Sequence, residues 1–234
     1  MTGKSKLDSA LYLVATPIGN LGDLTRRAIE TLESADHLYA EDTRHSRKLL
    51  LHLCIERNLQ PCHEHNEATV CQDVIRMIGN GQSCALISDA GSPGISDPGF
   101  RLVRACRKAG LPVYSIPGPS AVITALSISG LPTDSFRFVG FLPPKRAARL
   151  RFFEENKANS ETLVFFESTH RIDKFLEDAL SVFGGERAIC IARELTKRHE
   201  TVLTGTLNQV REQFAKGSSK GEFVVMVAKE GYEL

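Results

Sequence analysis

Short apolar runs alternate along the chain with longer segments in which apolar residues recur at helical spacing. A short continuous apolar run is typical of a strand buried on both faces of a sheet. In the first half these runs are LYLVAT (11–16), HLYAE (37–41), a weaker segment near 60–65, CALIS (84–88) and PVYSIP (112–117). Strands that alternate with helices predict a mostly parallel sheet with helices on both of its faces.

The helices expected between these strands have recognisable starts. Asp23 is positioned to cap a helix whose apolar stripe includes Leu24 and Ala35. Asp97-Pro98 indicates another helix start, because a capping residue followed by proline at the first helical position is a common arrangement. Two further helices are expected at 43–53 and 68–79.

The second half keeps the α/β character in a different order. Its expected strands are 136–141, 162–168, 188–195, 199–205 and 221–229. The strands at 188–195 and 199–205 follow each other directly, so they predict an antiparallel hairpin and a mixed sheet. A regular helix is expected from Ile172 to Phe183, and Thr206 with Gln209 forms the capping box of another.

The PGPS segment at 117–120 separates these two halves. We therefore predict an α/β protein with two domains, residues 1–117 with a mostly parallel sheet and residues 118–234 with a mixed sheet. A chain of 234 residues is long enough for two small domains, each with its own core.

Composition narrows the class of protein. With 42% hydrophobic and 24% charged residues, the chain has the composition of an ordinary globular protein. Its formal net charge of +1 excludes a strong overall attraction to nucleic acid or to an anionic membrane, so nucleic-acid binding would need a local basic patch. We expect no signal peptide and no membrane span. The six cysteines form no CxxC pair, which favours a reducing, cytoplasmic setting.

Three turns rich in glycine and proline, at 16–23, 88–99 and 117–121, follow predicted parallel strands. Ligands of open α/β sheets bind outside the carboxyl ends of the strands, and glycine lets the backbone approach them closely. One such turn is more often an ordinary connection, but three at one sheet edge favour a ligand crevice. None matches GxGxxG, GxxxxGK[ST] or GxSxG, which disfavours a dinucleotide dehydrogenase, a P-loop NTPase and an α/β hydrolase.

Charged residues gather at other strand ends. Glu41 and Asp42 could orient a substrate or accept a proton, although acidic residues at a helix N-terminus give the same pattern. The segment ARELTKRHE (192–200) is either a solvated hairpin tip or a contact for an anionic partner. His63 and His65 share one face of a strand, but no third ligand is placed beside them, so we expect no metal.

The FFESTHR segment (165–171) contains a candidate helix cap followed by positively charged residues, which are unfavourable at the start of a helix. Ser168 or Thr169 would cap the following helix, with His170 and Arg171 in its first turn. A cation there opposes the helix dipole, and such local conflicts are more common at functional sites.

Nine segments, in a fixed order, resemble those of one enzyme family. They are YLVATPIGNLGDLT, AEDTR, HEHNE, ISDAGSPGISDPG, IPGPSA, GLPTDSF, GFLPPK, FFESTHR and ARELTK. Together they resemble the tetrapyrrole methylase superfamily, which uses S-adenosyl-L-methionine (SAM), and within it the ribosomal RNA small-subunit methyltransferase I family, over about residues 11–229. The resemblance implies a homodimer that methylates the ribose 2′-hydroxyl of a cytidine in the 16S rRNA of the 30S subunit.

The resemblance also implies that SAM is bound in a cleft between the two domains. The expected cofactor contacts are Pro17, Ser88, Asp89, Ala90, Gly91, Ile95, Ser120, Ala121, Leu142, Arg193, Glu194 and Leu195. In this assignment residues 88–95 touch the cofactor, whereas Asp97-Pro98 mainly starts the next helix. Members of the family usually continue into a C-terminal helical extension that is thought to help hold RNA, and we expect it to be absent here, where the chain stops at EGYEL.

A ribose hydroxyl is a weak nucleophile, so a base or a nearby cation should assist the transfer of a methyl group to it. The charge density at strand ends makes Glu41, Asp42 and Lys197 the expected catalytic residues, with His170 a weaker candidate base. The expected RNA contacts are Arg44, Arg47, Lys145, Arg146, His170 and Arg171.

Two alternatives remain open at this point. One is a methyltransferase of the same superfamily that acts on a tetrapyrrole or in the diphthine pathway. The other is a non-catalytic module that binds SAM or RNA.

Overall fold

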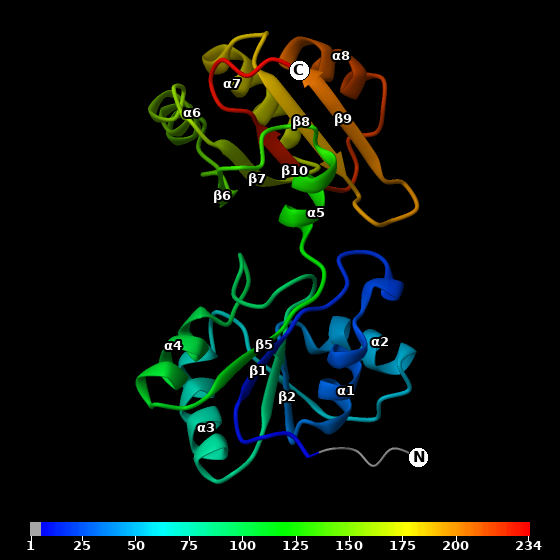
Figure 1. Cartoon of the computed structure of the whole chain (residues 1–234), viewed down its shortest axis with the longest axis vertical. Helices are drawn as coiled ribbons and strands as arrows, with labels where there is room; N and C mark the ends of the chain where they lie inside the picture. The colour runs from blue at the N-terminus through cyan, green and yellow to red at the C-terminus, as the bar shows by residue number, and fades with distance from the viewer. Residues whose placement is uncertain (1–5) are drawn as a thin grey trace. The chain divides into compact units, whose positions relative to one another are not determined.

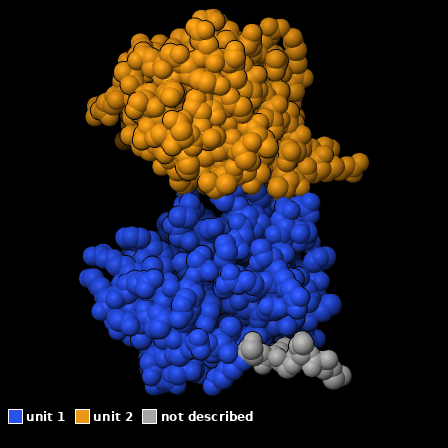
Figure 2. All heavy atoms as spheres, in the orientation of Figure 1, with its two compact units in different colours: residues 1–120 blue, residues 121–234 orange. Residues whose placement is uncertain are grey.

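The computed structural model describes residues 6–234. The chain forms two compact units, Met1–Ser120 and Ala121–Leu234, which Figure 2 colours separately. The boundary expected after residue 117 and the division after Ser120 both fall in the PGPS segment. Within residues 6–234, no helix combines the length and the apolar character needed to span a bilayer.

Unit 1 contains a five-stranded sheet in the order β3-β2-β4-β1-β5, and every pairing in it is parallel. Its strands are β1 (Leu11–Val14), β2 (His37–Ala40), β3 (Leu59–Pro61), β4 (Cys84–Ile87) and β5 (Val113–Ile116). The helices are η1 (Leu21–Asp23), α1 (Arg26–Ser34), α2 (Thr43–His52), α3 (Glu67–Gly79) and α4 (Phe100–Lys108). The parallel sheet predicted from the alternating pattern is therefore confirmed.

Each face of this sheet is covered by a pair of helices. Residues of α1 and α2, such as Leu32 and Leu50, pack with Val14 in one apolar cluster. On the other face α3 and α4 build a second cluster, which contains Val74 and Leu102. Figure 1 shows the two helix pairs on opposite sides of the strands. Burial on both faces explains why these strands are continuous apolar runs.

Two predicted helix starts in unit 1 are wrong. Asp23 ends the short helix η1, and the side chain of Thr25 instead accepts the backbone N–H of Ala28 at the start of α1. Helix α4 starts at Phe100, after Asp97-Pro98, with Gly99 as its cap residue. Gly99 has no side chain to offer, so the free N–H groups of this helix need an acceptor from elsewhere.

Unit 2 contains a mixed five-stranded sheet in the order β6-β7-β10-β8-β9, as predicted. Only β6 and β7 pair in parallel, and β8 with β9 forms the expected antiparallel hairpin. The strands are β6 (Phe136–Phe141), β7 (Thr162–Ser168), β8 (Ala188–Arg193), β9 (Thr201–Thr206) and β10 (Glu222–Val227). The expected helices are α7 (Ile172–Phe183) and α8 (Leu207–Ala215), and α8 has the predicted capping box.

Two helices of unit 2 are not apparent from the sequence. Helix α5 (Ala121–Ile128) is almost entirely apolar, so it lacks the polar face that would reveal its period. Helix α6 (Arg146–Glu155) buries Arg149, whose guanidinium pairs with Asp178 of α7 at 2.5 Å. A charged residue on the inner face breaks the apolar stripe that predicts a helix.

The expected cap of α7 is also wrong. This helix starts at Ile172 and has no side-chain cap. The hydroxyl of Thr169 is engaged elsewhere, since it donates to the Gly221 carbonyl at 2.9 Å and accepts the Gly221 N–H at 2.8 Å.

Candidate functional site

The three glycine- and proline-rich turns meet at the carboxyl edge of the sheet in unit 1. Thr16, after β1, and Gly91, after β4, exchange backbone hydrogen bonds of 2.8 and 3.1 Å. A Cβ placed on Gly91 would lie 3.6 Å from Ile18 and 3.8 Å from the carbonyl oxygen of Pro119. Gly91 therefore lies where the turns after β1, β4 and β5 come together, as the pattern of turns predicts.

Glu41 and Asp42, directly after β2, join the same edge. The backbone N–H of Asp42 donates to the Asp89 carboxylate at 3.2 Å. Burial raises the pKa of Glu41 to about 7, and the charges of Asp97 and Asp89 add to the effect, while a backbone hydrogen bond from Asp89 opposes it. The Glu41 Oε2 atom is buried and has no hydrogen-bond partner among the described residues. Glu41 is thus a carboxylate that can hold or release a proton near neutral pH.

Asp42 has a different environment, although it is the next residue. Its Oδ1 atom accepts the backbone N–H of Arg44 at 2.8 Å, which caps α2. The guanidinium of Arg44 pairs with the same carboxylate at 2.9 Å. These hydrogen bonds from Arg44 lower the pKa of Asp42 to about 2. Asp42 is therefore a weaker base than Glu41 and has a structural role as a helix cap.

Side chains within unit 1 form hydrogen bonds with residues 97–102, at the end of the turn after β4 and the start of α4. Burial raises the pKa of Asp97 to about 6, against the effect of a hydrogen bond from Ser88. Glu67, at the start of α3, is buried, and its Oε1 atom accepts the N–H groups of Gly99 and Leu102 at 3.1 Å each. Glu67 thus supplies the cap that Gly99 cannot. The sequence has no local signal for this role, because cap and helix lie more than 30 residues apart.

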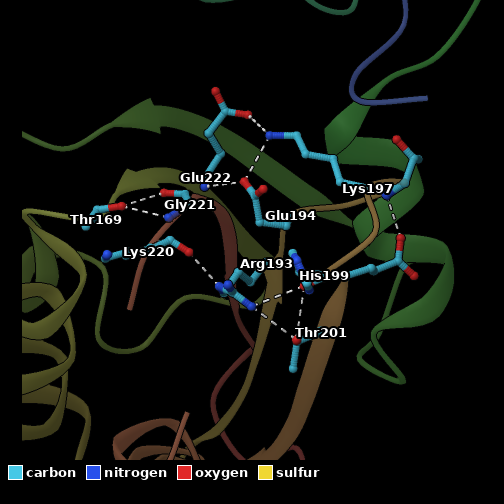
Figure 3. A network of polar contacts seen from close by, with 11 residues as sticks. Thr169, Arg193, Glu194, Lys197, His199, Thr201, Lys220, Gly221 and Glu222 are labelled. Atoms are coloured by element: carbon cyan, nitrogen blue, oxygen red, sulfur yellow. Dashed lines mark hydrogen bonds and ion pairs between the residues drawn. The ribbon is translucent and has the colours of Figure 1, made fainter. Parts of the chain in front are cut away.

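The cofactor contacts expected in unit 2 include a turn with unusual backbone geometry. Glu194 and Thr196, on both sides of the buried Leu195, have φ values of +52° and +64°. A left-handed conformation at two residues other than glycine is costly and needs support from its surroundings. Figure 3 shows this support.

Lys197 is central to that support. Its Nζ atom lies 2.9 Å from Glu194 Oε1 and 2.8 Å from Glu222 Oε2. Burial alone would lower the pKa of Lys197, but its hydrogen bonds to Glu222 and Glu194 raise it. The Arg193 guanidinium donates to the carbonyls of Lys220 and His199, which ties the hairpin to the chain before β10 (Figure 3). The expected catalytic lysine is therefore already paired with two carboxylates.

Ala121 is the first residue of α5, and the other expected residues of unit 2 follow the carboxyl ends of β6 and β7. The Leu142 side chain belongs to the core, so only its backbone is available to a ligand. The Arg171 guanidinium donates to the Leu142 carbonyl and pairs with buried Glu167 at 3.3 Å. The guanidinium of Arg146, which is largely exposed, donates to Asp178 at 2.8 Å. Arg171 thus links the segments after β6 and β7 that carry Lys145, Arg146, His170 and Arg171. We call these four residues the basic area of unit 2, in which Asp178 pairs with Arg146 and Glu167 pairs with Arg171.

His63 and His65 lie next to each other after β3. The rings of His63 and His65 contact each other edge to face, with centroids 5.9 Å apart. In the part of the chain that the structure describes, no group of three or more His, Cys, Asp or Glu side chains is arranged to hold a metal ion.

The family profile described as Tetrapyrrole (Corrin/Porphyrin) Methylases matches residues 10–211. The ribosomal RNA small subunit methyltransferase I of Xylella fastidiosa (strain Temecula1) is 52% identical over 219 residues, which are 93% of this chain and 80% of the relative. The protein of the same name from Vibrio cholerae is 50% identical over 93% of this chain and 76% of its own length. The protein of the same name from Escherichia coli O157:H7 is 45% identical over 95% of this chain and 78% of its own length.

Solved structures show the same fold at low sequence identity. Uroporphyrin-III-C-methyltransferase from Thermus thermophilus matches with a TM-score of 0.64 and 22% identity over 94% of both chains. Diphthine synthase matches with a TM-score of 0.70 and 12% identity, over 94% of this chain and 90% of the other. The chain belongs to the tetrapyrrole methylase family and, within it, to the family of ribosomal RNA small subunit methyltransferase I.

Proposed function

We propose that this protein transfers a methyl group from SAM to the ribose 2′-hydroxyl of a cytidine in the 16S rRNA of the small ribosomal subunit. Its 45–52% identity to ribosomal RNA small subunit methyltransferase I supports the substrate class. The observation that carries the chemistry is Glu41, a half-buried carboxylate with a buried Oε2 atom and a pKa of about 7, beside the turn after β4.

The turns of unit 1 suit a ligand such as SAM. SAM carries two positive groups, the sulfonium and the ammonium, and the carboxylates of Glu41, Asp89 and Asp97 gather at this edge. Gly91 lies at the centre of the turns, where an added Cβ would contact Ile18 and the carbonyl of Pro119. We assign the cofactor contacts of unit 1 to Pro17, Ser88, Asp89, Ala90, Gly91, Ile95 and Ser120. We assign those of unit 2 to Ala121, Leu142, Arg193, Glu194 and Leu195.

When bound, SAM supplies a methyl group that already has a good leaving group. The protein then has to position the acceptor hydroxyl in line with that methyl carbon and to keep water away. The Glu41 carboxylate would accept the proton of the ribose hydroxyl while the hydroxyl oxygen bonds to the methyl carbon, and the electron pair of the carbon–sulfur bond that breaks would be taken up by the sulfonium of bound SAM. Among the expected catalytic residues, Glu41 is the one whose pKa suits this transfer near neutral pH.

The remaining parts of the proposal concern partners and location. Arg44 and Arg47 of unit 1, together with the basic area of unit 2, are proposed to contact RNA phosphates. The working form is proposed to be a homodimer in the cytoplasm, where the six unpaired cysteines would stay reduced.

Methyl transfer to unmodified 30S subunits tests the function. With tritiated SAM, we expect label in 16S rRNA at a single cytidine, and resistance of the following phosphodiester bond to alkali would place the methyl group on the 2′-oxygen. SAM binding without label in any ribosomal RNA would instead favour the non-catalytic module. Label in a small molecule or a protein would favour the other methyltransferase classes.

Lys197 offers a separate test of the turn at 194–197. In Lys197→Met the carboxylates of Glu194 and Glu222 lose their shared cation, so we expect the free energy of unfolding to fall by about 1 kcal/mol and the affinity for SAM to fall with it. Urea unfolding and calorimetry with SAM measure the two effects. Lys220→Met is the control, because it removes an equal charge and keeps the backbone carbonyl that accepts from Arg193. If SAM affinity and stability hold while turnover falls, Lys197 acts on the substrate and not on the turn.

A further inference from the structure

Helix α4, which follows the turn after β4, presents a basic surface that no part of the proposed mechanism uses. Its sequence FRLVRACRK contains four cations and no acidic residue. At 100° per residue, Arg101, Arg104 and Lys108 lie within about 60° of one another, opposite the face that Leu102 and Cys106 bury. Over the eight residues from Arg101 to Lys108, which are seven steps of helical rise, the row extends for about 10 Å along the helix axis.

These three cations have no directly paired carboxylate in the part of the chain that the structure describes. Within residues 6–234, none of them forms a hydrogen bond or an ion pair through its side chain. Other helices of the same unit differ, because Arg26 of α1 pairs with Glu30 and Arg76 of α3 pairs with Asp73. Helix stability accounts for Lys108, because a cation in the last turn favours the helix dipole, but it does not account for Arg101, which lies in the first turn and opposes the dipole.

An exposed aromatic residue lies at the end of this row nearest the proposed cofactor turn. Phe100, the first residue of α4, is 67% exposed. Ile95 in the preceding turn is 53% exposed. Large apolar side chains in this position are available to a ligand, and an aromatic ring beside a row of cations is the combination that binds single-stranded nucleic acid.

We propose that the exposed face of α4 binds the RNA substrate next to the methylation site. Arg101, Arg104 and Lys108 hold successive phosphates of the strand, and Phe100 stacks on an unpaired base. The unpaired positive charge and the adjacent ring identify the partner as RNA, since a protein surface would need acidic residues to match the same row. This inference rests on the proposed rRNA methyltransferase activity and adds a contact that the expected RNA-binding residues do not include.

The salt dependence of binding tests the row of cations. Binding to unmodified 30S subunits is measured for wild type and for Arg101→Gln/Arg104→Gln at several KCl concentrations. Two lost phosphate contacts should reduce the slope of log Kobs against log[KCl] by about 1.4–1.8, with the affinity for free SAM unchanged. Lys157→Gln/Lys229→Gln removes two charges from the end of unit 2 where β7 starts, and its slope should equal that of wild type.

Phe100→Ala tests the stacking contact. Loss of one stacked base should weaken binding about tenfold without a change in the salt slope. If both α4 variants bind like wild type while wild-type protein binds and methylates the subunit, the inference is wrong and the proposed function stands. If wild-type protein neither binds nor methylates the subunit, the proposed function is wrong, and the inference, which rests on it, is wrong as well. A shift of Phe100→Ala from dimer to monomer in sedimentation, with RNA binding unchanged, would assign this face to a second copy of the chain and overturn the inference.

Discussion

Replacing Glu41 by Gln is expected to lower kcat for methyl transfer by about 10²-fold or more, because the amide cannot accept a proton from the ribose hydroxyl. In the wild-type protein kcat should rise with pH through about 7, as the Glu41 carboxyl ionises, and then level off. The variant should lose this rising limb. Single-turnover rates with saturating SAM and 30S subunits, measured from pH 5.5 to 9, give both results.

The same substitution should make the fold more stable in alkaline solution. Burial holds the pKa of Glu41 at about 7, above its ordinary value of 4.5. The folded protein therefore binds a proton more tightly than the unfolded chain, and stability decreases as the pH rises from 4.5 through 7. The amide of Glu41→Gln brings no charge into the buried position, so we expect the variant to be more stable than wild type at pH 8 by about 2 kcal/mol.

Asp42→Asn is the matched control for Glu41→Gln. Asn is as good a helix cap as Asp, so α2 keeps its start, and a carboxylate with a pKa of about 2 is not the base that this proposal needs. Turnover near the wild-type value is expected. If Asp42→Asn lost as much turnover as Glu41→Gln, Asp42 would be the base. If Glu41→Gln kept wild-type turnover and the rise of kcat with pH, Glu41 would have no part in the mechanism.

The strands can be predicted closely because their signal is local. In β4 and in β7 nearly every side chain is buried, so the run of apolar residues is the strand itself. Helix starts are less predictable wherever the cap comes from a distant residue. Glu67 caps α4 from another helix, and Arg149 is tolerated inside α6 because Asp178 lies opposite it. The partners of each pair lie about 30 residues apart in the sequence, so a local pattern cannot reveal them.

The candidate site also has one part that the sequence predicts, the three turns, and one part that it does not, the chemical difference between Glu41 and Asp42. Glycines and prolines indicate the three turns, because turn geometry requires those residues. The chemical difference between Glu41 and Asp42 cannot be predicted from the sequence, since both follow the same strand. It arises from the burial of Glu41 beside Asp89 and Asp97, whereas Asp42 binds Arg44, its neighbour in the helix. The sequence pattern predicts a helix start at Asp97, and the structure instead places this residue beside Ser88.

Replacing Gly91 by Val is expected to weaken SAM binding by about 5- to 150-fold, the equivalent of 1–3 kcal/mol of backbone strain. Gly91 has a φ of +75°, and its two hydrogen bonds with Thr16 keep the backbone in place. A β-branched residue is strained in this conformation. The turn would relax toward another shape, and SAM would have to restore the native one in order to bind.

Gly110→Val separates this effect from strain alone. Gly110 has a similar φ of +69°, nothing lies within 4 Å of the position of its added Cβ, and it follows the end of α4, away from the turns. Both variants should lose stability by about 1–3 kcal/mol, but Gly110→Val should bind SAM like wild type in calorimetry. Equal SAM affinity in the two variants would place the cofactor away from the turn after β4. A loss confined to Gly91→Val would support the assignment of that turn, since the two substitutions differ in position and hardly in backbone strain.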